Sequence, residues 1–278
     1  MILCKTENQL RQALRHTADT GFVPTMGALH QGHLALIRES RQQHACTIAS
    51  IFVNPTQFNE AADFTQYPRT LDKDIALLLE AGCDVLFLPA TSEIYPRGTE
   101  NLPHYDLGRL EQLLEGKFRP GHFQGVCQVV YRLLTLVKPS CLYLGEKDYQ
   151  QCLVIREMIR QTRLPVQWSI VPTLREESGL AMSSRNLRLS AVQRSQASAI
   201  YEVLHYLKTH LEPGSLQPLL DHAEADLLRA GFKQPDYIAI TDAETLETVD
   251  TWNGRQSLRG LIAARMGDIR LIDNMRLN

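Results

Sequence analysis

The sequence lacks the features that mark membrane, secreted and nucleic-acid-binding proteins. No apolar run approaches the ~20 residues that a helix needs to cross a bilayer. The opening residues, "MILCKTENQLRQAL", are interrupted by polar Lys5 to Asn8, which is not typical of a signal peptide. The 29 Lys and Arg residues against 31 Asp and Glu residues leave no basic excess for nucleic acid. We therefore expect a cytoplasmic protein with no membrane span and no nucleic-acid partner.

Paired cysteine motifs are also missing. The six cysteines include no Cys-x-x-Cys pair, and most of them stand inside apolar runs. They are Cys4, Cys46, Cys83, Cys127, Cys141 and Cys152. This usage predicts buried, reduced thiols rather than disulfides or a structural zinc site.

The first two thirds of the chain alternate strand-like apolar runs with helical patterns. We expect strands at 21–26, 46–54, 83–89, 141–148 and 166–174, and helices at 33–45, 71–82, 126–139 and 149–163. Apolar strands separated by helices predict an α/β domain with a doubly wound parallel sheet. Ligands of such sheets bind at the carboxyl ends of the strands.

The pattern changes after about residue 177. Ser190 and Gln193 predict a capping box for a long helix at about 191–212, and a second helix is expected at 215–230. Residues 235–250 alternate like a strand, and "RGLIAARMGDIRLIDN" predicts two short strands with a glycine turn. The chain should therefore divide into residues 1–176 and a smaller α+β unit, residues 177–278. The long loop at 54–70, which contains two prolines, is expected to be functional.

The stretch "PTMGALHQGHL" follows the first expected strand. Gly27 lets the backbone turn, Gly32 lets a ligand approach closely, and His30 and His33 stand where a helix begins. A helix N-terminus attracts anions, so these imidazoles suit a phosphate. An ordinary helix start and a metal site remain open, although no third ligand has suitable zinc spacing.

Three further polar stretches follow other expected strands. In "LGEKDYQQ", Lys147 can neutralise a phosphate and Asp148 can hold Mg²⁺ or its waters. Two hydroxyls and a cation come together in "GLAMSSRN", as Ser183, Ser184 and Arg185, and the amides Gln57 and Gln151 can hold a small acid. Each stretch alone also suits an ordinary polar turn. Their occurrence at one edge of one sheet favours nucleotide binding.

These motifs together resemble the pantoate–β-alanine ligase (pantothenate synthetase) family. The resemblance rests on "PTMGALHQGHL", "SIFVNPTQF", "YPRTLDKD", "RPGHFQGV", "LGEKDYQQ", "MSSRN" and "RLIDN", which span nearly the whole chain. The family belongs to the HIGH/KMSKS nucleotidyltransferase superfamily, whose domain is Rossmann-like, and His30 to His33 stand at the HIGH position. The resemblance implies that ATP and pantoate form pantoyl adenylate, which β-alanine converts to pantothenate and AMP. It also implies Mg²⁺ at the triphosphate and a homodimer.

The resemblance also implies roles for individual residues. The catalytic set is His30, His33, Lys147 and Arg185, with His33 acting as proton donor or by electrostatic stabilisation. The ATP-binding set is Met26, Gly27, Ala28, Leu29, His30, Gln31, Gly32, His33, Gly145, Glu146, Lys147, Asp148, Leu174, Met182, Ser183, Ser184 and Arg185. Pantoate is assigned to Gln57 and Gln151, assisted by Asn54 and Arg119, and Gln57 also borders β-alanine. Asp148 is assigned to Mg²⁺, and the C-terminal unit to a lid.

Two positions depart from the wider pattern. Ala181 and Ser184 stand where the superfamily loop carries lysines, so Lys147 and Arg185 are expected to supply that charge. Leu187 and Arg188 stand where members of the family often have an aromatic residue after Ser-Arg-Asn. Three other functions remain open: a cytidylyltransferase, a nucleotide-binding regulator without catalysis, and a zinc hydrolase.

Overall fold

The structure is a computed structural model that describes residues 1–58 and 64–278. The chain forms two compact units. The first contains Met1–Glu146 and Gln151–Pro172, and the second contains Lys147–Gln150 and Thr173–Asn278. The boundary lies four residues before the division expected at residue 176, and the sequence pattern did not separate the short segment 147–150.

The first unit contains the predicted parallel sheet, which has the five expected strands and a sixth, β1, that was not expected. The strand order is β1-β4-β3-β2-β5-β6. Their bounds are β1 (Ile2–Cys4), β2 (Thr20–Thr25), β3 (Cys46–Ile51), β4 (Val85–Phe87), β5 (Cys141–Gly145) and β6 (Gln167–Val171). The strand expected at 46–54 ends at Ile51 because Asn54 caps a 3-10 helix, η1 (Pro55–Gln57). Residues 59–63 of the expected 54–70 loop lie outside the described residues.

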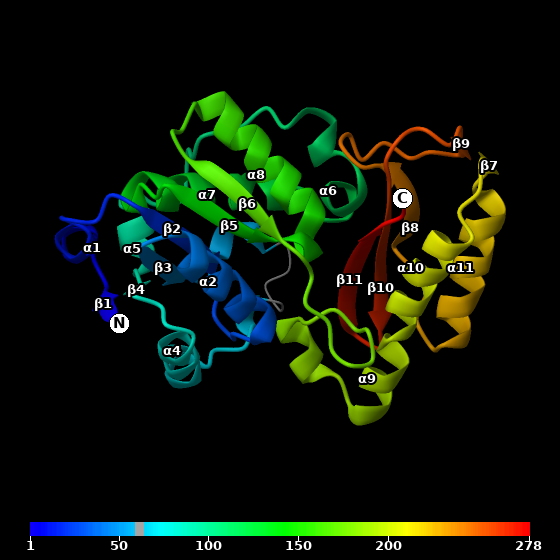
Figure 1. Cartoon of the computed structure of the whole chain (residues 1–278), viewed down its shortest axis with the longest axis horizontal. Helices are drawn as coiled ribbons and strands as arrows, with labels where there is room; N and C mark the ends of the chain where they lie inside the picture. The colour runs from blue at the N-terminus through cyan, green and yellow to red at the C-terminus, as the bar shows by residue number, and fades with distance from the viewer. Residues whose placement is uncertain (59–63) are drawn as a thin grey trace. The chain divides into compact units, whose positions relative to one another are not determined.

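Helices cover both faces of this sheet (Figure 1). Helices α2 (Gln31–Gln43) and α4 (Leu71–Glu80) pack on one face through a core that includes Val23, Ala49 and Leu86. Helices α7 (His122–Val137) and α8 (Tyr149–Thr162) pack on the other, over a core that includes Phe22 and Leu142. Shorter helices are α1 (Glu7–Ala13), α5 (Thr91–Ile94), α6 (Leu114–Phe118) and η2 (Gly108–Glu111). These two covered faces confirm the doubly wound class.

The strand order reverses between β2 and β5. These strands are paired with Gly21 opposite Cys141 and Phe22 opposite Leu142, and each ends three residues later. Their carboxyl ends therefore lie side by side. In doubly wound sheets this reversal opens the crevice where ligands bind, so the residues that follow Thr25 and Gly145 are well placed for a ligand.

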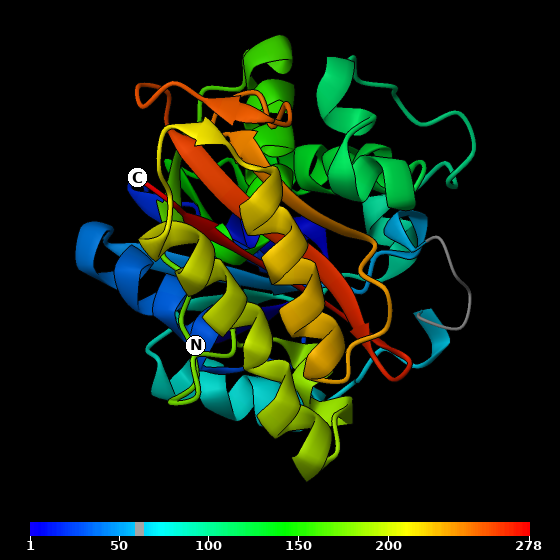
Figure 2. The ribbon, with the colours of Figure 1, turned by 90° about the vertical axis from the view of Figure 1, so that its right-hand side faces the viewer.

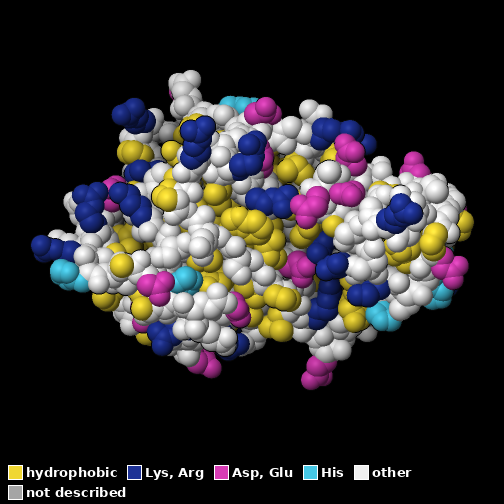
Figure 3. All heavy atoms as spheres, turned by 45° about the horizontal axis from the view of Figure 1, so that its top comes forward, with side chains coloured by type: hydrophobic (Ala, Val, Ile, Leu, Met, Phe, Trp, Pro, Cys, Tyr) yellow, Lys and Arg dark blue, Asp and Glu magenta, His cyan; other side chains and the backbone are white. Residues whose placement is uncertain are grey.

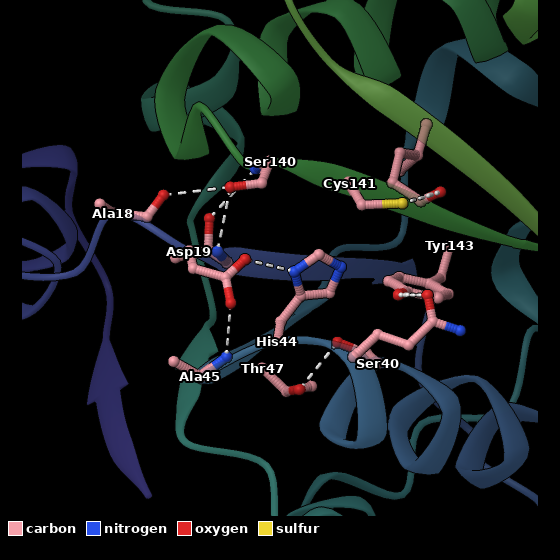
Figure 4. A network of polar contacts seen from close by, with 12 residues as sticks. Ala18, Asp19, Ser40, His44, Ala45, Thr47, Ser140, Cys141 and Tyr143 are labelled. Atoms are coloured by element: carbon pink, nitrogen blue, oxygen red, sulfur yellow. Dashed lines mark hydrogen bonds and ion pairs between the residues drawn. The ribbon is translucent and has the colours of Figure 1, made fainter.

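A network of polar groups ties the loops at the opposite, amino end of the sheet (Figure 4). The Asp19 carboxylate accepts hydrogen bonds from His44 Nδ1 at 2.6 Å and from the Ala45 N–H at 3.0 Å. Ser140 Oγ donates to the Ala18 carbonyl at 3.1 Å and accepts from the Thr20 N–H at 3.2 Å. These bonds fasten the entrances of β2, β3 and β5 to one another.

The second unit is built on an antiparallel sheet in the order β11-β10-β8. The strands are β8 (Tyr237–Asp242), β10 (Leu258–Met266) and β11 (Ile269–Arg276). Figure 2 shows helices α10 (Ala199–Thr209) and α11 (Gln217–Arg229) lying across this sheet. Their core includes Val203, Leu204, Leu227 and Ile262. This arrangement confirms the smaller α+β unit.

Three expectations for this unit were wrong in detail. The helix expected at 191–212 is two helices, α9 (Ala191–Ala197) and α10, because Ser198 Oγ bonds the Ser195 carbonyl and competes with the helix there. The capping box of Ser190 and Gln193 is confirmed. The helix expected from residue 215 begins at Gln217, since β7 (Gly214–Ser215) pairs with β9 (Thr251–Trp252). The two "short" strands are β10 and β11, of nine and eight residues.

The cysteine prediction is confirmed for packing, since all six thiols are free and buried. The face of the molecule drawn in Figure 3 carries both basic and acidic side chains. Within the described ranges, no helix combines the length and the apolar composition that a membrane crossing requires.

Candidate active site

The first bend, residues 26–33, is held in an unusual conformation by one buried carboxylate. Gly27 and Ala28 both have positive φ angles, 81° and 50°. Asp74 Oδ2 accepts from the Ala28 N–H at 2.9 Å, and Asp74 Oδ1 accepts from the Leu29 N–H at 2.8 Å. Thr70 Oγ1 adds a third bond to Asp74 at 3.0 Å. Asp74 is 1% exposed, so these bonds are protected from water.

Two of the residues assigned to ATP, Ala28 and Leu29, take part in this arrangement through their N–H groups, which donate to Asp74. These bonds hold the backbone of the bend in shape, and the assignment of both residues to ATP stays a prediction. Asp74 itself was missed, because an acid in the first turn of a helix normally serves the helix alone.

Two imidazoles stand at the N-terminus of α2. His30 is the N-cap residue and His33 the third helical residue, and their ring centroids are 4.0 Å apart. The helix thus begins at Gln31, two residues before the expected start. The His30 N–H donates to His33 Nδ1 at 3.3 Å. A ring nitrogen that accepts carries no proton, so the neutral His33 ring carries its proton on Nε2. The exposed Gln31 side chain instead bonds Arg38 at 3.2 Å.

Buried amides follow β3. Asn54 Nδ2 donates to Gln57 Oε1 at 3.2 Å and to the Gly125 carbonyl at 3.1 Å. The Tyr95 hydroxyl donates to Asn54 Oδ1 at 2.8 Å. Burial raises the pKa of Tyr95, which keeps this hydroxyl protonated and able to donate. Gln57 Nε2 donates to Met26 Sδ at 2.9 Å, which brings the amide pair to the first bend.

The Gln57 backbone is held by His122, the first residue of α7, which in turn contacts Arg119, the C-cap residue of α6. His122 Nδ1 donates to the Gln57 carbonyl at 2.8 Å, which leaves His122 Nε2 to accept from Arg119 Nη1 at 3.0 Å. Arg119 also lies 3.6 Å from the Glu115 carboxylate. The sequence motif "RPGHFQGV" contains His122, but its link to Gln57 spans 65 residues and needed the fold. Gln151 lies half-buried in α8.

The other expected ATP residues lie at the end of the first unit's first segment and in the second unit. Gly145 and Glu146 end the first unit's chain segment, and η3 (Glu146–Asp148) leads into the second unit. Lys147 Nζ lies 3.8 Å from Asp148 Oδ1, and its side chain is 17% exposed. Burial raises the pKa of the neighbouring Asp273 carboxyl, while Arg175, the Asn274 N–H and Lys147 act in the opposite direction. Lys147 therefore lies in a partly buried, charged setting.

The serine-rich segment forms a short helix instead of an open loop. Ser183 caps η4 (Ser184–Arg188) by accepting from the Arg185 N–H at 3.3 Å. Asn186 donates to the Ala181 carbonyl and to Glu176, both at 3.0 Å. The Met182 N–H donates to the Leu174 carbonyl at 3.0 Å, so Leu174 and Met182 are joined by their backbones. These bonds fix the backbone of residues 182–186, immediately before Leu187 and Arg188.

The carboxylates in the described part of the chain do not form a protein-only metal centre. Among those residues, no group of three or more His, Cys, Asp and Glu could hold a metal ion. Mg²⁺ at a triphosphate needs one or two carboxylates, and Asp148, 46% exposed beside Lys147, is suited to that.

Comparison with known proteins finds pantoate–β-alanine ligases that are similar to this chain over nearly its whole length. A family model described as "Pantoate-beta-alanine ligase" matches residues 2–276. The pantothenate synthetase of Thermus thermophilus is 45% identical over 273 residues, which cover 98% of each chain. That of Magnetococcus marinus is 47% identical over 259 residues, covering 92% of this chain and 89% of that protein.

Solved structures show the same similarity in three dimensions. The pantothenate synthetase of Thermus thermophilus matches with a TM-score of 0.91 at 45% identity, covering 100% of this chain and 99% of that one. The pantoate-beta-alanine ligase of Francisella tularensis, solved in complex with beta-gamma ATP and beta-alanine, matches with a TM-score of 0.85 at 36% identity. That match covers 99% of this chain and 97% of that one.

Proposed function

The chain is a member of the pantoate–β-alanine ligase family, and on that premise we propose that it makes pantothenate from pantoate, β-alanine and ATP. One observation carries the residue assignments. Gln57 of the Asn54–Gln57 amide pair bonds Met26, which begins the same bend that ends with the imidazoles at the N-terminus of α2, and both groups follow the carboxyl ends of β2 and β3. An anion site thus adjoins a site for a small polar acid.

The reaction has two steps. A pantoate carboxylate oxygen attacks the α-phosphorus of ATP, the bond to the bridging oxygen breaks, and pyrophosphate leaves. The β-alanine amine, having lost a proton, then attacks the acyl carbon of the adenylate, and AMP leaves with the electron pair of its ester oxygen. Charge grows on the phosphate oxygens in the first step, so preorganised donors accelerate it.

His30 and His33 are the donors that we assign to that charge. The bond from His30 N–H to His33 Nδ1 leaves Nε2–H as the donor of the neutral His33 ring. The α2 N-terminus adds its partial positive charge. We therefore favour electrostatic stabilisation by His33 at the α-phosphate over proton transfer. Asp74 keeps the bend in shape while these groups act.

Gln57 is the group that we assign to pantoate, together with Gln151. Its Oε1 is occupied by Asn54, while its Nε2 donates to the sulfur of Met26. A thioether is a weak acceptor, so a pantoate oxygen can replace it. We assign an indirect role to Arg119. It bonds His122, and His122 in turn bonds the Gln57 carbonyl and fixes the Gln57 backbone.

In the second unit, we assign Lys147 and Arg185 to phosphate oxygens, with hydroxyl groups from Ser183 and Ser184. Gly145, Glu146, Leu174 and Met182 border the nucleotide, and Leu174 meets adenine through its backbone. Asp148 would hold Mg²⁺, which when bound neutralises charge on the triphosphate. We propose that the second unit acts as the lid of this site, that the protein is cytoplasmic, and that it is a homodimer. Sedimentation of the purified protein tests the last point.

A turnover assay with single omissions tests the function. Pyrophosphate should exchange into ATP only when pantoate is present, and net AMP release should require β-alanine as well. Exchange without pantoate, or AMP release that ignores β-alanine, would contradict the proposal. Nucleotide transfer to a phosphate ester, with no amide product, would favour the cytidylyltransferase alternative instead.

A further inference from the structure

Two consecutive side chains of β11 hold two separate segments of the second unit. Asp273 pairs with Arg175, with Nη1 to Oδ2 at 2.5 Å and Nη2 to Oδ1 at 3.1 Å. Asn274 Nδ2 donates to the carbonyl of Lys147 at 2.8 Å. Asp273 and Asn274 are each 4% exposed. Buried bonds of this kind fix the groups they join more firmly than exposed ones.

The Asp273 contact fixes the chain that leads into Ser183–Arg185. Arg175 also donates to the Gly179 carbonyl at 3.1 Å, and its guanidinium lies 4.8 Å from the centre of the Tyr201 ring. Residues 175 and 181 are joined by a β-bridge. Arg175 also donates to the Asn274 carbonyl at 3.3 Å, so the base of the serine-rich segment is attached to β11 through a bidentate ion pair and one further hydrogen bond.

The Asn274 contact fixes the main chain at Lys147. Asn274 Oδ1 accepts from Arg259, and since a guanidinium only donates, the Asn274 amide nitrogen must face the Lys147 carbonyl. Arg259 also lies 3.6 Å from the centre of the Tyr149 ring, and the Tyr149 hydroxyl bonds the Ala243 carbonyl at 2.9 Å. Residues 147–149 are thus held at several points to the rest of the second unit.

We propose that Asp273 and Asn274 are positioning residues that hold Lys147 and Ser183–Arg185 as one phosphate-binding piece. The inference rests on the proposed function, which assigns both segments to the phosphates of ATP. Because the two side chains are adjacent on one strand, a shift of β11 changes both contacts together. Lysine and the serine-rich segment then keep a fixed spacing when they meet the triphosphate.

Asn274→Asp breaks one bond while keeping the shape of the side chain. The carboxylate still accepts from Arg259, but it has no N–H to donate and places an oxygen against the Lys147 carbonyl. We expect kcat for pantoate-dependent pyrophosphate exchange to fall roughly tenfold, with the pantoate KM unchanged. The matched control is Asn278→Asp, because the Asn278 amide nitrogen also donates to a backbone carbonyl, that of Gln256 at 2.9 Å. An equal loss in both variants would overturn the inference.

A double-mutant cycle separates positioning from general damage. Lys147→Ala should reduce exchange strongly, and adding Asn274→Asp to it should reduce exchange by less than about twofold further. If the activity loss of the double variant equals the product of the two single losses, Asn274 does not act through Lys147. A wild-type protein without exchange would contradict the proposed function itself, and normal exchange in Lys147→Ala would contradict the role of the lysine. Normal exchange in Asn274→Asp alone contradicts only this inference.

Arg175→Lys supplies a second test that does not depend on the folding of the Asn274 variant. A lysine keeps the charge but loses the two-pronged contact with Asp273. If the segments form one piece, hydrogen–deuterium exchange should speed up in residues 146–150 as well as in 175–186. Faster exchange confined to 175–186 would show that the two segments are held independently.

Discussion

Helix α2 has histidines at both of its ends, and the histidines at the two ends make different contacts. His30 and His33 stand at its N-terminus, beside the carboxyl ends of the strands, with ring centroids 4.0 Å apart. His44 is its C-cap residue, at the amino end of the sheet, where it bonds Asp19 and meets the edge of Tyr143 (Figure 4). The same side chain attaches loops at the amino end, whereas at the other end we assign it to ligand chemistry.

The two ends also use carboxylates differently. Asp74 is buried and accepts two backbone N–H groups from a bend with positive φ angles. Asp19 accepts one backbone N–H and one imidazole, and its side chain is 54% exposed. The position on the parallel sheet therefore decides the role of a residue more than its type does.

The histidine pair gives the largest expected difference. His33→Ala should lower the rate of adenylate formation by roughly 10²–10³-fold, because it removes one preorganised donor, and should leave the fold intact. His44→Ala should lower the melting temperature and leave that rate near the wild-type value. Pantoate-dependent pyrophosphate exchange and thermal unfolding measure both. An equal loss of exchange in the two variants would remove the distinction between the ends.

The carboxylate pair should give the next largest difference. Asp74→Asn leaves one buried N–H facing an amide nitrogen, which costs about 1–3 kcal/mol of stability. If the transition state of adenylate formation loses the same free energy, exchange falls roughly 5- to 150-fold. Asp19→Asn is the control at the amino end, and its exchange rate should not change. Full activity in Asp74→Asn would show that the shape of the bend does not matter to catalysis.

Substitutions of two glycines test packing at the carboxyl end and at the amino end of the parallel sheet. A Cβ on Gly125 would lie 2.4 Å from the Thr56 carbonyl oxygen, so Gly125→Ala should push η1 and raise the pantoate KM about three- to tenfold. A Cβ on Gly21 would lie 2.0 Å from Ser40 Oγ. Gly21→Ala should therefore lower stability and leave the pantoate KM unchanged. Steady-state kinetics with varied pantoate compare the two, and a raised KM in Gly21→Ala would contradict the division of roles.

The pH dependence of the stability that Asp19 contributes, at the amino end of the sheet, should be the smallest effect. The hydrogen bond from His44, followed by the Ala45 N–H, lowers the pKa of Asp19. A lowered pKa in the folded state means that the ionised form favours folding. This contribution is fully present above the unfolded pKa of about 3.9 and is lost as the pH falls through the folded value. The melting-temperature difference between wild type and Asp19→Asn should therefore shrink below about pH 4. A difference that stays constant with pH would contradict the stabilising role of the ionised Asp19.

The sequence predicted the parts of the fold that depend on local patterns. Runs such as "CTIASI" and the capping box at Ser190 are readable from neighbouring residues, and both are observed. The start of α7 at His122, four residues before the expected position, follows the left-handed conformation of Gly121. The three residues of β1 are too few to show a pattern, so they were missed.

The site was readable where its residues are close in the chain and hidden where they are not. Gly27, His30 and His33 lie within one bend, whose turn has the positive φ expected at Gly27. Asp74 acts on residues 45 and 46 positions away, and His122 acts on a residue 65 positions away. No short pattern encodes such distances. Asn274 acts across 127 positions and needed the fold for the same reason.

The buried thiols have a practical consequence for labelling. Burial raises the pKa of Cys4, Cys46 and Cys141, and it raises the pKa of Cys83 and Cys127 to about 12. Alkylating reagents attack the thiolate, which is scarce at these positions near neutral pH. A cysteine introduced on the surface would react far faster than the native ones. A fluorophore or spin probe could then be attached at one chosen point of the otherwise unaltered protein.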